Sequence, residues 1–172
     1  GPGPAIVPTP GEAGWEEVAY DPPGRAGRNY GWRNREGAHE NVTSRPALFL
    51  PLVDPIHEYD HNAGASITGG YVYRGTALGA FYRGRYFFAD FITSRVWSIG
   101  LIVNATTGEA RASGLLEHTA DLGGASALSG VSSFGLDAEG ELYIVSYSRG
   151  AVLKMIATPA APPTPTGLRI IR

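Results

Sequence analysis

The segment with the most specific chemical pattern is His57-Glu-Tyr-Asp-His61, which matches the His-Glu-x-x-His sequence of zinc hydrolases. On a helix, the two histidines lie one turn apart, where both can bind Zn²⁺ while the glutamate acts as general base. Asp54 as N-cap and Pro55 at the first helical position could begin such a helix. Zinc-dependent hydrolysis at His57, Glu58 and His61 is one hypothesis, but the same residues also fit a loop before the next strand.

Other residues with chemical potential have structural interpretations. The segment Asp137-Ala-Glu-Gly-Glu141 lacks the spacing of an EF-hand, and its residues are typical of a hairpin turn. The aromatic pair Phe87-Phe88 could stack on a planar cofactor, but such side chains more often fill the space between sheets. His39 and His118 have no companions at ligand spacing, and we expect both to be solvated loop residues.

A repeat organises the second half of the chain. When the sequence is shifted by 56 positions, Tyr86-Phe-Phe-Ala-Asp-Phe91 aligns with Leu142-Tyr-Ile-Val-Ser-Tyr147 without a gap. Val96-Trp-Ser-Ile99 likewise aligns with Val152-Leu-Lys-Met155. A period of this length in a strand-rich sequence predicts repeated sheet modules, of which propeller blades are the best-known kind.

Asp90 is a further candidate because it ends a predicted buried strand, where the loops of a propeller face its central channel. The carboxylate could bind a ligand or cofactor there. It could equally cap the following turn through hydrogen bonds from backbone N–H groups. Both interpretations stay open at this stage.

The composition suits short strands joined by tight turns, since the 172 residues include 24 Gly, 13 Pro, nine Tyr and six Phe. A formal net charge of −2 gives no reason to expect binding to nucleic acid or to an anionic membrane. The absence of cysteine excludes disulfides and thiolate metal sites. No apolar run is long enough to span a bilayer, and the first residues have no features of an export signal.

The predicted elements are almost all strands, so we expect an all-β fold. The ranges are 15–20, 66–74, 84–90, 95–102, 111–117, 131–137, 141–147 and 151–156. At four strands a blade, these make about three blades, too few to close a ring. The open ends would leave sheet edges exposed, which favours self-association. Residues 158–172 are rich in Pro and Thr and predict a linker and C-terminal tail after a domain of residues 1–157.

Several segments together carry a family resemblance. They are Trp15-Glu-Glu-Val18, Asn29-Tyr-Gly-Trp32, Arg35-Glu-Gly37, Pro55 to His61, Ser66 to Gly75, Tyr86 to Phe91 and Ser132 to Tyr143. In this order and spacing, the chain resembles the C-terminal half of the glucose/sorbosone dehydrogenase family, over about residues 8–157. The resemblance implies a partial six-bladed β-propeller. It also implies oxidation of an aldose or polyol with pyrroloquinoline quinone (PQQ) and calcium, in an extracellular or periplasmic setting.

The resemblance assigns residues as follows. The family's proton-abstracting histidine lies upstream of the matched region, so no catalytic residue is expected in this chain. Gly11 and Glu12 correspond to a calcium-binding loop that uses backbone carbonyls. His61 corresponds to an aromatic position facing the cofactor, and we group it with Asp90 as a cofactor-binding candidate.

In PQQ-binding members, a lysine and an Arg-x-Arg pair hold the carboxylates of the quinone. The corresponding positions here are Ile92, Gly130 and Ser132, none of which can pair with a carboxylate. The resemblance extends to the hedgehog-interacting relatives of this family, which keep the propeller without the cofactor. An alternative to the dehydrogenase is therefore a non-catalytic propeller that binds a protein or glycan partner. The chain alone is expected to be inactive.

Overall fold

The computed structural model describes residues 14–25, 27–41, 49–158 and 168–171. Its strands are β1 (Trp15–Val18), β2 (Arg35–Glu36), β3 (His39–Glu40), β4 (His57–Asp60), β5 (Ile67–Thr68), β6 (Tyr86–Asp90), β7 (Val96–Val103), β8 (Ala110–Glu117), β9 (Val131–Leu136), β10 (Leu142–Ser146), β11 (Ala151–Ala157) and β12 (Leu168–Ile171). In these ranges the helical elements are the short α1 (Ala125–Leu128) and the 3-10 turn η1 (Ala80–Tyr82). The all-β prediction is confirmed.

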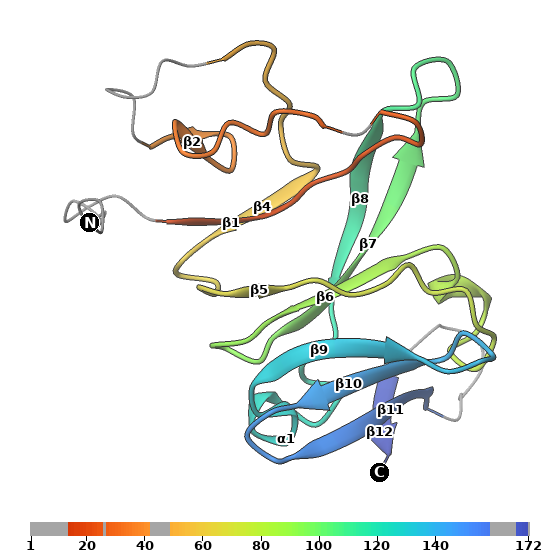
Figure 1. Cartoon of the computed structure of the whole chain (residues 1–172). Helices are drawn as coiled ribbons and strands as arrows, with labels where there is room; N and C mark the ends of the chain where they lie inside the picture. Colours follow the sequence, from red (N-terminus) through yellow and green to blue (C-terminus); the bar gives the residue numbers. More distant parts are fainter. Residues whose placement is uncertain (1–13, 26, 42–48, 159–167, 172) are drawn as a thin grey trace.

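The strands form four antiparallel sheets that follow one another along the long axis of Figure 1. Two sheets have four strands in the orders β5-β6-β7-β8 and β9-β10-β11-β12, so each is a simple meander in which neighbours in sequence pair. The other two sheets have two strands each, β1-β4 and β2-β3. Where about three four-stranded sheets were expected, the described residues form two, and none of their sheets closes into a barrel.

The 56-residue repeat corresponds to the two four-stranded sheets. Strand β6 occupies the same position in its sheet as β10 does in the next, and β7 corresponds to β11. The chain passes from β8, at one edge of the first sheet, through α1 to β9 at the edge of the second. The first strands of the two sheets lie side by side, because Thr68 Oγ1 of β5 donates a hydrogen bond to the Val131 carbonyl of β9 at 2.8 Å.

The main core lies between the two four-stranded sheets. Phe87 and Ala89 of β6 are fully buried against the apolar face of β10, where Leu142 and Ile144 are also fully buried. Alternation along a strand explains this arrangement, since every second side chain points to the same face. The rest of the core comprises Tyr73, Leu78, Tyr82, Val96, Leu122, Leu128, Val131, Phe134, Leu153, Met155 and Leu168.

A smaller core covers the opposite face of the β5–β8 sheet. Phe88 of β6 and Trp97 of β7 contact Val18 and Tyr59 of the β1-β4 sheet, together with Ile99. The Phe88 and Trp97 rings stack with their centroids 5.4 Å apart. Strand β6 and the first half of β7 are therefore enclosed on both faces, which explains why Phe87 and Phe88 are adjacent in sequence and both fully buried.

Three sequence predictions need correction. The strand predicted over 66–74 is interrupted at Gly69-Gly70: β5 covers Ile67–Thr68, and pairing with residues 84–87 resumes at residues 71–73 through a bridge from Val72 to Tyr86. A Cβ atom on Gly70 would lie 2.3 Å from the Phe87 carbonyl oxygen, so only glycine allows this approach. The helix that Asp54 and Pro55 could have begun under the zinc hypothesis is not formed, since His57–Asp60 is strand β4.

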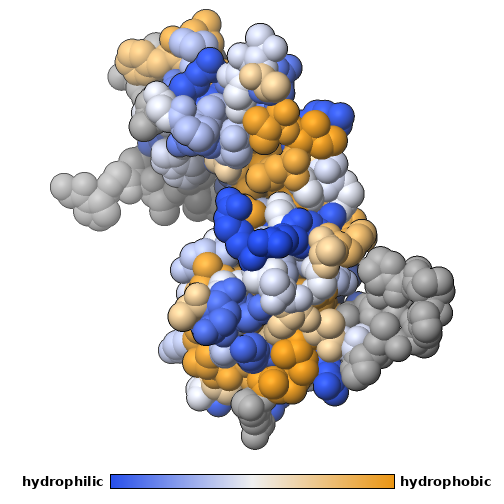
Figure 2. Space-filling model, turned by 90° about the vertical axis from the view of Figure 1, so that its right-hand side faces the viewer, coloured by the Kyte–Doolittle hydropathy of each residue, from blue (hydrophilic) through white to orange (hydrophobic). Residues whose placement is uncertain are grey.

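The third correction concerns the C-terminal segment. Leu168–Ile171 was assigned to a tail, but it pairs with β11 and is the edge strand of the second four-stranded sheet. Leu168 is fully buried in the main core, so this strand contributes to the sheet's packing. Figure 2 shows hydrophobic surface at the lower end of the molecule, where this sheet lies. No described helix is long and apolar enough to cross a membrane.

Candidate functional site

The loops that follow β4 and β6 and the loop that precedes β9 meet at the left edge of Figure 1. Phe91 N–H donates to the Ser66 carbonyl at 2.8 Å, and Gly130 N–H donates to Ser94 Oγ at 2.7 Å. We call this group of loops, residues 61–66, 91–95 and 129–132, the loop rim. The predicted cofactor-binding residue His61 belongs to it, and the side chain of the other, Asp90, bonds to it. Ile92, Gly130 and Ser132, which replace the cationic residues of PQQ-binding members, belong to it as well.

Asp90 is fully buried, and its carboxylate accepts four hydrogen bonds. One oxygen accepts from Ser66 N–H at 2.7 Å and from the Tyr59 hydroxyl at 3.2 Å. The other accepts from Thr93 N–H at 2.7 Å and from Thr93 Oγ1 at 3.0 Å. This is the geometry of a turn cap that also ties two loops together. Burial and the adjacent Asp90 carboxylate raise the pKa of the Tyr59 hydroxyl, which therefore stays protonated as a donor.

His61 lies on the exposed side of the loop rim. Its Nε2 is 3.3 Å from Glu16 Oε1, and its backbone N–H donates to the Gly14 carbonyl at 3.0 Å. The ring is therefore held beside the first described residues of the chain. Its cofactor-facing role, like that of Asp90, stays a prediction, and Gly11 and Glu12, the predicted calcium positions, lie outside the described residues.

The three positions expected to grip the quinone do not fit that task. Ile92 is 64% exposed, Gly130 adopts a left-handed backbone with φ +71°, and Ser132 Oγ donates to the Val145 carbonyl at 3.4 Å. None of these residues carries a positive charge, so a quinone carboxylate would meet no ammonium or guanidinium group at them. These residues therefore do not match PQQ.

The zinc-binding arrangement is not formed either. In β4, His57 pairs across from Val18 and Glu58 pairs across from Glu17, so the two side chains point to opposite faces. His57 packs 5.6 Å from the Phe88 ring, and burial lowers its pKa against the opposing effect of Glu58. Among the described residues, no group of three or more His, Cys, Asp or Glu side chains is placed to hold a metal ion.

A cleft of about 250 Å³ opens beside β1 and joins aromatic, acidic and basic side chains. We call it the Trp15 cleft. Its lining residues are Trp15, Glu16, Glu17, Tyr30, Trp32, Arg35, Glu36, Gly37 and Ile67. Trp15 stacks on His39 with ring centroids 3.7 Å apart, while Trp32 is 72% exposed. In the sequence these segments stand out only through the family resemblance, and no local spacing reveals the cleft.

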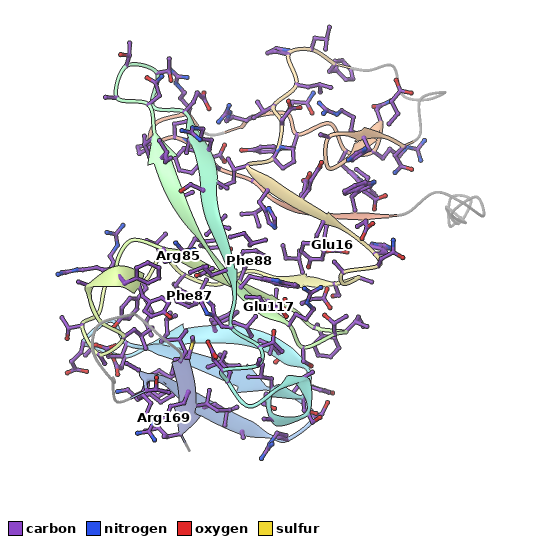
Figure 3. The ribbon with its side chains drawn as sticks, turned by 180° about the vertical axis from the view of Figure 1, so that it is seen from behind. Glu16, Arg85, Phe87, Phe88, Glu117 and Arg169 are labelled. Atoms are coloured by element: carbon purple, nitrogen blue, oxygen red, sulfur yellow. The ribbon has the colours of Figure 1, made fainter. Side chains whose placement is uncertain are left out.

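The carboxylates of this cleft have unequal partners. Glu16, labelled in Figure 3, accepts a hydrogen bond from Ile67 N–H at 2.8 Å. Burial raises the pKa of Glu17, and the neighbouring carboxylate of Glu58 raises it further. Arg35 forms an ion pair with Asp54 at 2.7 Å, which directs its charge partly out of the cleft. Glu17 is therefore a half-buried carboxylate whose ionised form a hydroxyl-bearing or cationic ligand would stabilise.

A buried polar network lies on the side of the β5–β8 sheet that faces away from the Trp15 cleft. No spacing in the sequence indicates it. His118 is 2% exposed, not a solvated loop residue, because its N–H donates to the Val96 carbonyl and extends the pairing of β7 with β8. His118 Nε2 is 2.8 Å from Ser98 Oγ, which in turn accepts from Arg85 Nε at 2.8 Å. Burial, helped by the Arg85 charge, lowers the pKa of His118 to about 4.

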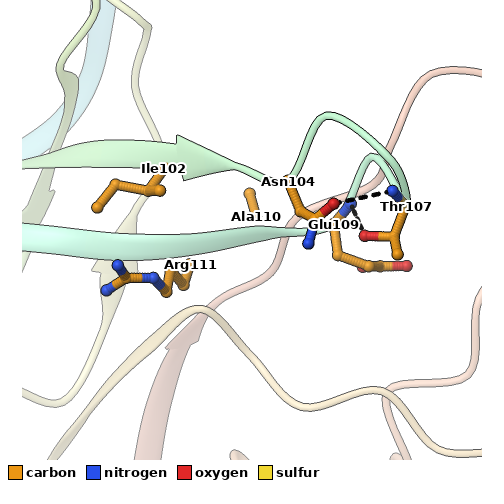
Figure 4. A pocket seen from close by; sticks show the side chains of 6 residues that line it. All are labelled: Ile102, Asn104, Thr107, Glu109, Ala110 and Arg111. Atoms are coloured by element: carbon orange, nitrogen blue, oxygen red, sulfur yellow. Dashed lines mark hydrogen bonds between the residues drawn. The ribbon is translucent and has the colours of Figure 1, made fainter.

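A second depression, of about 310 Å³, lies at the tip of the β7–β8 hairpin (Figure 4). Its polar groups bond within the hairpin: Asn104 Oδ1 accepts from Thr107 N–H at 3.0 Å, and Thr107 Oγ1 accepts from Glu109 N–H at 3.2 Å. Glu109 also forms ion pairs with Arg25 and Arg28. The depression is thus explained by hairpin structure, and the Trp15 cleft has the better set of groups for a ligand.

Comparisons with known proteins give only partial similarity. No model of a protein family matches the chain, and no solved structure matches it. The chain is similar to the HIPL2 protein of Arabidopsis thaliana, with 36% identity over 83 residues, which is 42% of this chain and 12% of that protein. The chain thus matches only a small part of the length of this curated relative.

Proposed function

We propose that this chain is the C-terminal part of a six-bladed β-propeller of the glucose/sorbosone dehydrogenase type. Two features support the proposal: successive four-stranded meanders stack face to face, and their first strands lie side by side. Propeller blades have this arrangement, in which the first strands surround a central channel. The β1-β4 sheet, packed on the other face of the β5–β8 sheet, would belong to a further blade.

We propose that this propeller part recognises a glycan without oxidising it. The observation that carries the proposal is the Trp15 cleft, where Tyr30 and Trp32 stand beside Glu17 and Arg35. Flat indole and phenol rings offer an apolar surface to the C–H face of a pyranose, and the Tyr30 hydroxyl is held by Asp21 Oδ1 at 2.7 Å, which fixes its ring. Carboxylate and guanidinium groups bind the sugar hydroxyls at the ring edge. Such a ligand suits an extracellular or periplasmic location.

Titration calorimetry with neutral hexasaccharides of glucose, mannose and N-acetylglucosamine tests this proposal. We expect one of them to bind the chain, and Trp32→Ala to weaken that binding at least about tenfold. Phe81→Ala is the matched control, since Phe81 is an exposed aromatic residue on η1, outside the cleft lining. Failure of all three sugars to bind the folded chain, or equal losses in both variants, would refute glycan recognition in this cleft.

A second candidate is sugar oxidation with PQQ and calcium, for which the protein would supply placement. It is favoured by the loop rim, which gathers His61 and Ile92 with the turn capped by Asp90. It is opposed by the lack of positive charge at the three quinone-grip positions. Calorimetric titration of PQQ into the protein, with millimolar calcium, decides between the two candidates. Saturable binding at micromolar concentrations supports sugar oxidation. A folded protein that gives no heat of binding refutes sugar oxidation.

A further inference from the structure

The hairpin that joins β7 to β8 ends in a turn over residues 104–108, which carries the triplet Asn104-Ala-Thr106. Asn-x-Ser/Thr is the sequence pattern at which N-linked oligosaccharides are attached, and the attached group needs an accessible surface loop. Asn104, Ala105 and Thr106 are all exposed, and the turn projects at the end of its hairpin in Figure 1. The triplet therefore meets the steric requirement for this modification.

The turn holds the Asn104 side chain by its oxygen and leaves its nitrogen available. Asn104 Oδ1 accepts hydrogen bonds from Thr106 N–H at 2.9 Å and from Thr107 N–H at 3.0 Å. These bonds form an Asx turn, which fixes the orientation of the side-chain amide. Among the described residues, none accepts a hydrogen bond from Asn104 Nδ2, so the atom that would receive the sugar is free.

The depression at the tip of this hairpin, about 310 Å³ in volume, lies beside Asn104 (Figure 4). Ile102, which is 44% exposed, lies opposite Arg111 in the β7–β8 pairing, and both residues line the depression together with Ala110. A hexose ring has an apolar face and a polar edge. It can therefore cover Ile102 with its apolar face while a hydroxyl accepts a hydrogen bond from the Arg111 guanidinium.

Covalent attachment changes what this depression can hold. Its polar groups bond mainly within the hairpin, so it offers little affinity for a free sugar. A sugar linked to Asn104 would be held beside Ile102 at an effective concentration on the order of millimolar or higher, and it would need almost no affinity of its own. Such a sugar would also remove part of the exposed Ile102 side chain from water.

We propose that Asn104 is a site of N-linked glycosylation and that the first sugar of the attached oligosaccharide packs on Ile102 in this depression. In the reaction, Asn104 Nδ2 forms a bond to C1 of the first sugar of an oligosaccharide carried on a lipid diphosphate. The bond between C1 and the diphosphate oxygen breaks, the lipid diphosphate leaves with the electron pair, and Nδ2 loses one proton. The modification is distinct from glycan recognition in the Trp15 cleft, but it rests on the extracellular location proposed with that function.

Peptide mass spectrometry of the full chain, exported from insect cells behind a cleavable signal, tests the attachment. The chain carries Asn41→Gln, because Asn41-Val-Thr43 is a second triplet of this type, part of which lies outside the described residues. We expect an oligosaccharide at Asn104 that peptide-N-glycosidase releases and that Asn104→Gln and Thr106→Ala both abolish. Thr107→Ala is the matched control and should keep the oligosaccharide, because Thr107 is an exposed threonine of the same turn but not of the triplet. An unmodified Asn104, or an oligosaccharide that persists in Thr106→Ala, would overturn the proposal.

Translation of the same chains in the presence of microsomes guards against a variant that is not exported. Attachment should raise the apparent mass of the chain on electrophoresis, and glycosidase treatment should reverse the shift. We expect the shift in the Asn41→Gln chain and in its Thr107→Ala variant, but not in the Asn104→Gln variant. No shift in microsomes that modify a standard acceptor protein would overturn the attachment as well.

Thermal unfolding tests the position of the first sugar. Ile102→Ser should lower the unfolding midpoint by about 2 °C more in the glycosylated chain than in the Asn104→Gln chain, because only the glycosylated chain loses a contact with the sugar. Val103→Ser is the control: Val103 is 51% exposed and lies on the other side of β7, so its effect should be the same in both chains. Equal effects of Ile102→Ser in both chains would overturn the packing of the sugar on Ile102. None of these results depends on the binding of free sugars, so this proposal and glycan recognition in the Trp15 cleft fail separately.

Discussion

Strands β6 and β10 hold the same place in two copies of one repeat, yet their environments differ. Both faces of β6 are enclosed, and its adjacent Phe87 and Phe88 point into different cores (Figure 3). β10 is enclosed on one face, and its buried Ile144 alternates with half-buried Tyr143 and Val145. The repeat thus specifies strands and register, whereas the position of a sheet in the stack specifies which faces become core.

The polar groups of the two sheets differ in a related way. In the β5–β8 sheet, Arg85, Ser98 and His118 form a buried network. The positions 56 residues after Arg85 and Ser98 are Glu141 and Lys154. Glu141 accepts a hydrogen bond from the Tyr73 hydroxyl at the end of the second sheet, and Lys154 bonds to Asp137 on the exposed face of that sheet. Of these equivalent pairs, Ser98 is buried whereas Lys154 is half-buried, and Arg85 is half-buried whereas Glu141 is buried, so the polar groups were fitted to each site separately.

The largest test of this contrast is a pair of equivalent truncations. We expect Phe87→Ala to lower the free energy of unfolding by about 4 kcal/mol, because it leaves a cavity between two packed sheets. Its counterpart Tyr143→Ala should cost roughly 1 kcal/mol, since it removes a half-buried ring and one hydrogen bond. Urea denaturation of both variants measures the difference. Similar losses would show that the two faces are equally important for stability.

The next effect concerns Glu141, which is 5% exposed and accepts bonds from the Tyr73 hydroxyl at 2.6 Å and from two backbone N–H groups, Thr76 and Ala77, at 2.8 and 2.9 Å. Glu141→Ala should cost about 3 kcal/mol, because it leaves buried donors without an acceptor. Glu139→Ala, on the exposed turn next to it, serves as control and should leave the unfolding midpoint unchanged. Equal stabilities of the two variants would argue against this buried acceptor.

A pH-dependent effect distinguishes the first sheet from the second. The folded-state pKa of His118 is lowered from 6.5 to about 4, so the unfolded chain binds this proton at a higher pH than the folded chain does. Its contribution to stability is therefore complete above pH 6.5 and decreases as the pH falls toward 4. Between pH 7 and pH 5 we expect a loss of about 2 kcal/mol. Urea denaturation at both pH values should show that the free energy of unfolding of His118→Gln no longer decreases in this way. The same decrease in the variant would contradict the role of His118.

The smallest effect is expected on the exposed face of the β9–β12 sheet, which carries Tyr143 and Lys154. Lys154 is held by Asp137 and Tyr143 in a partly exposed group, so Lys154→Met should move the thermal unfolding midpoint only slightly. Raising the salt concentration should reduce even that difference. Calorimetric scans at low and high salt measure it. A large decrease at both salt concentrations would mean that this face is as tightly packed as that of β6.

The part of the site that could be predicted from the sequence was limited to chain segments. Asp90 was recognised as the end of a buried strand, and the structure adds that both of its oxygens are occupied by turn and loop donors. The Trp15 cleft was not predicted, because its walls come from segments more than 50 residues apart, between Trp15 and Ile67. Likewise, no local pattern marks His118 as buried, since its burial depends on where β8 ends against β7.

The sequence by itself determined the local elements. Alternating apolar residues, aromatic strand formers and glycine turns located β6 to β11 to within about two residues, because strand pairing between neighbours is encoded locally. The tertiary structure alone decided which side chains are enclosed, which of the two histidines in the His-Glu-x-x-His segment faces a core, and that Leu168–Ile171 joins a sheet. Those outcomes depend on contacts between segments that are distant in the sequence. Which segments meet is decided only when the sheets pack together.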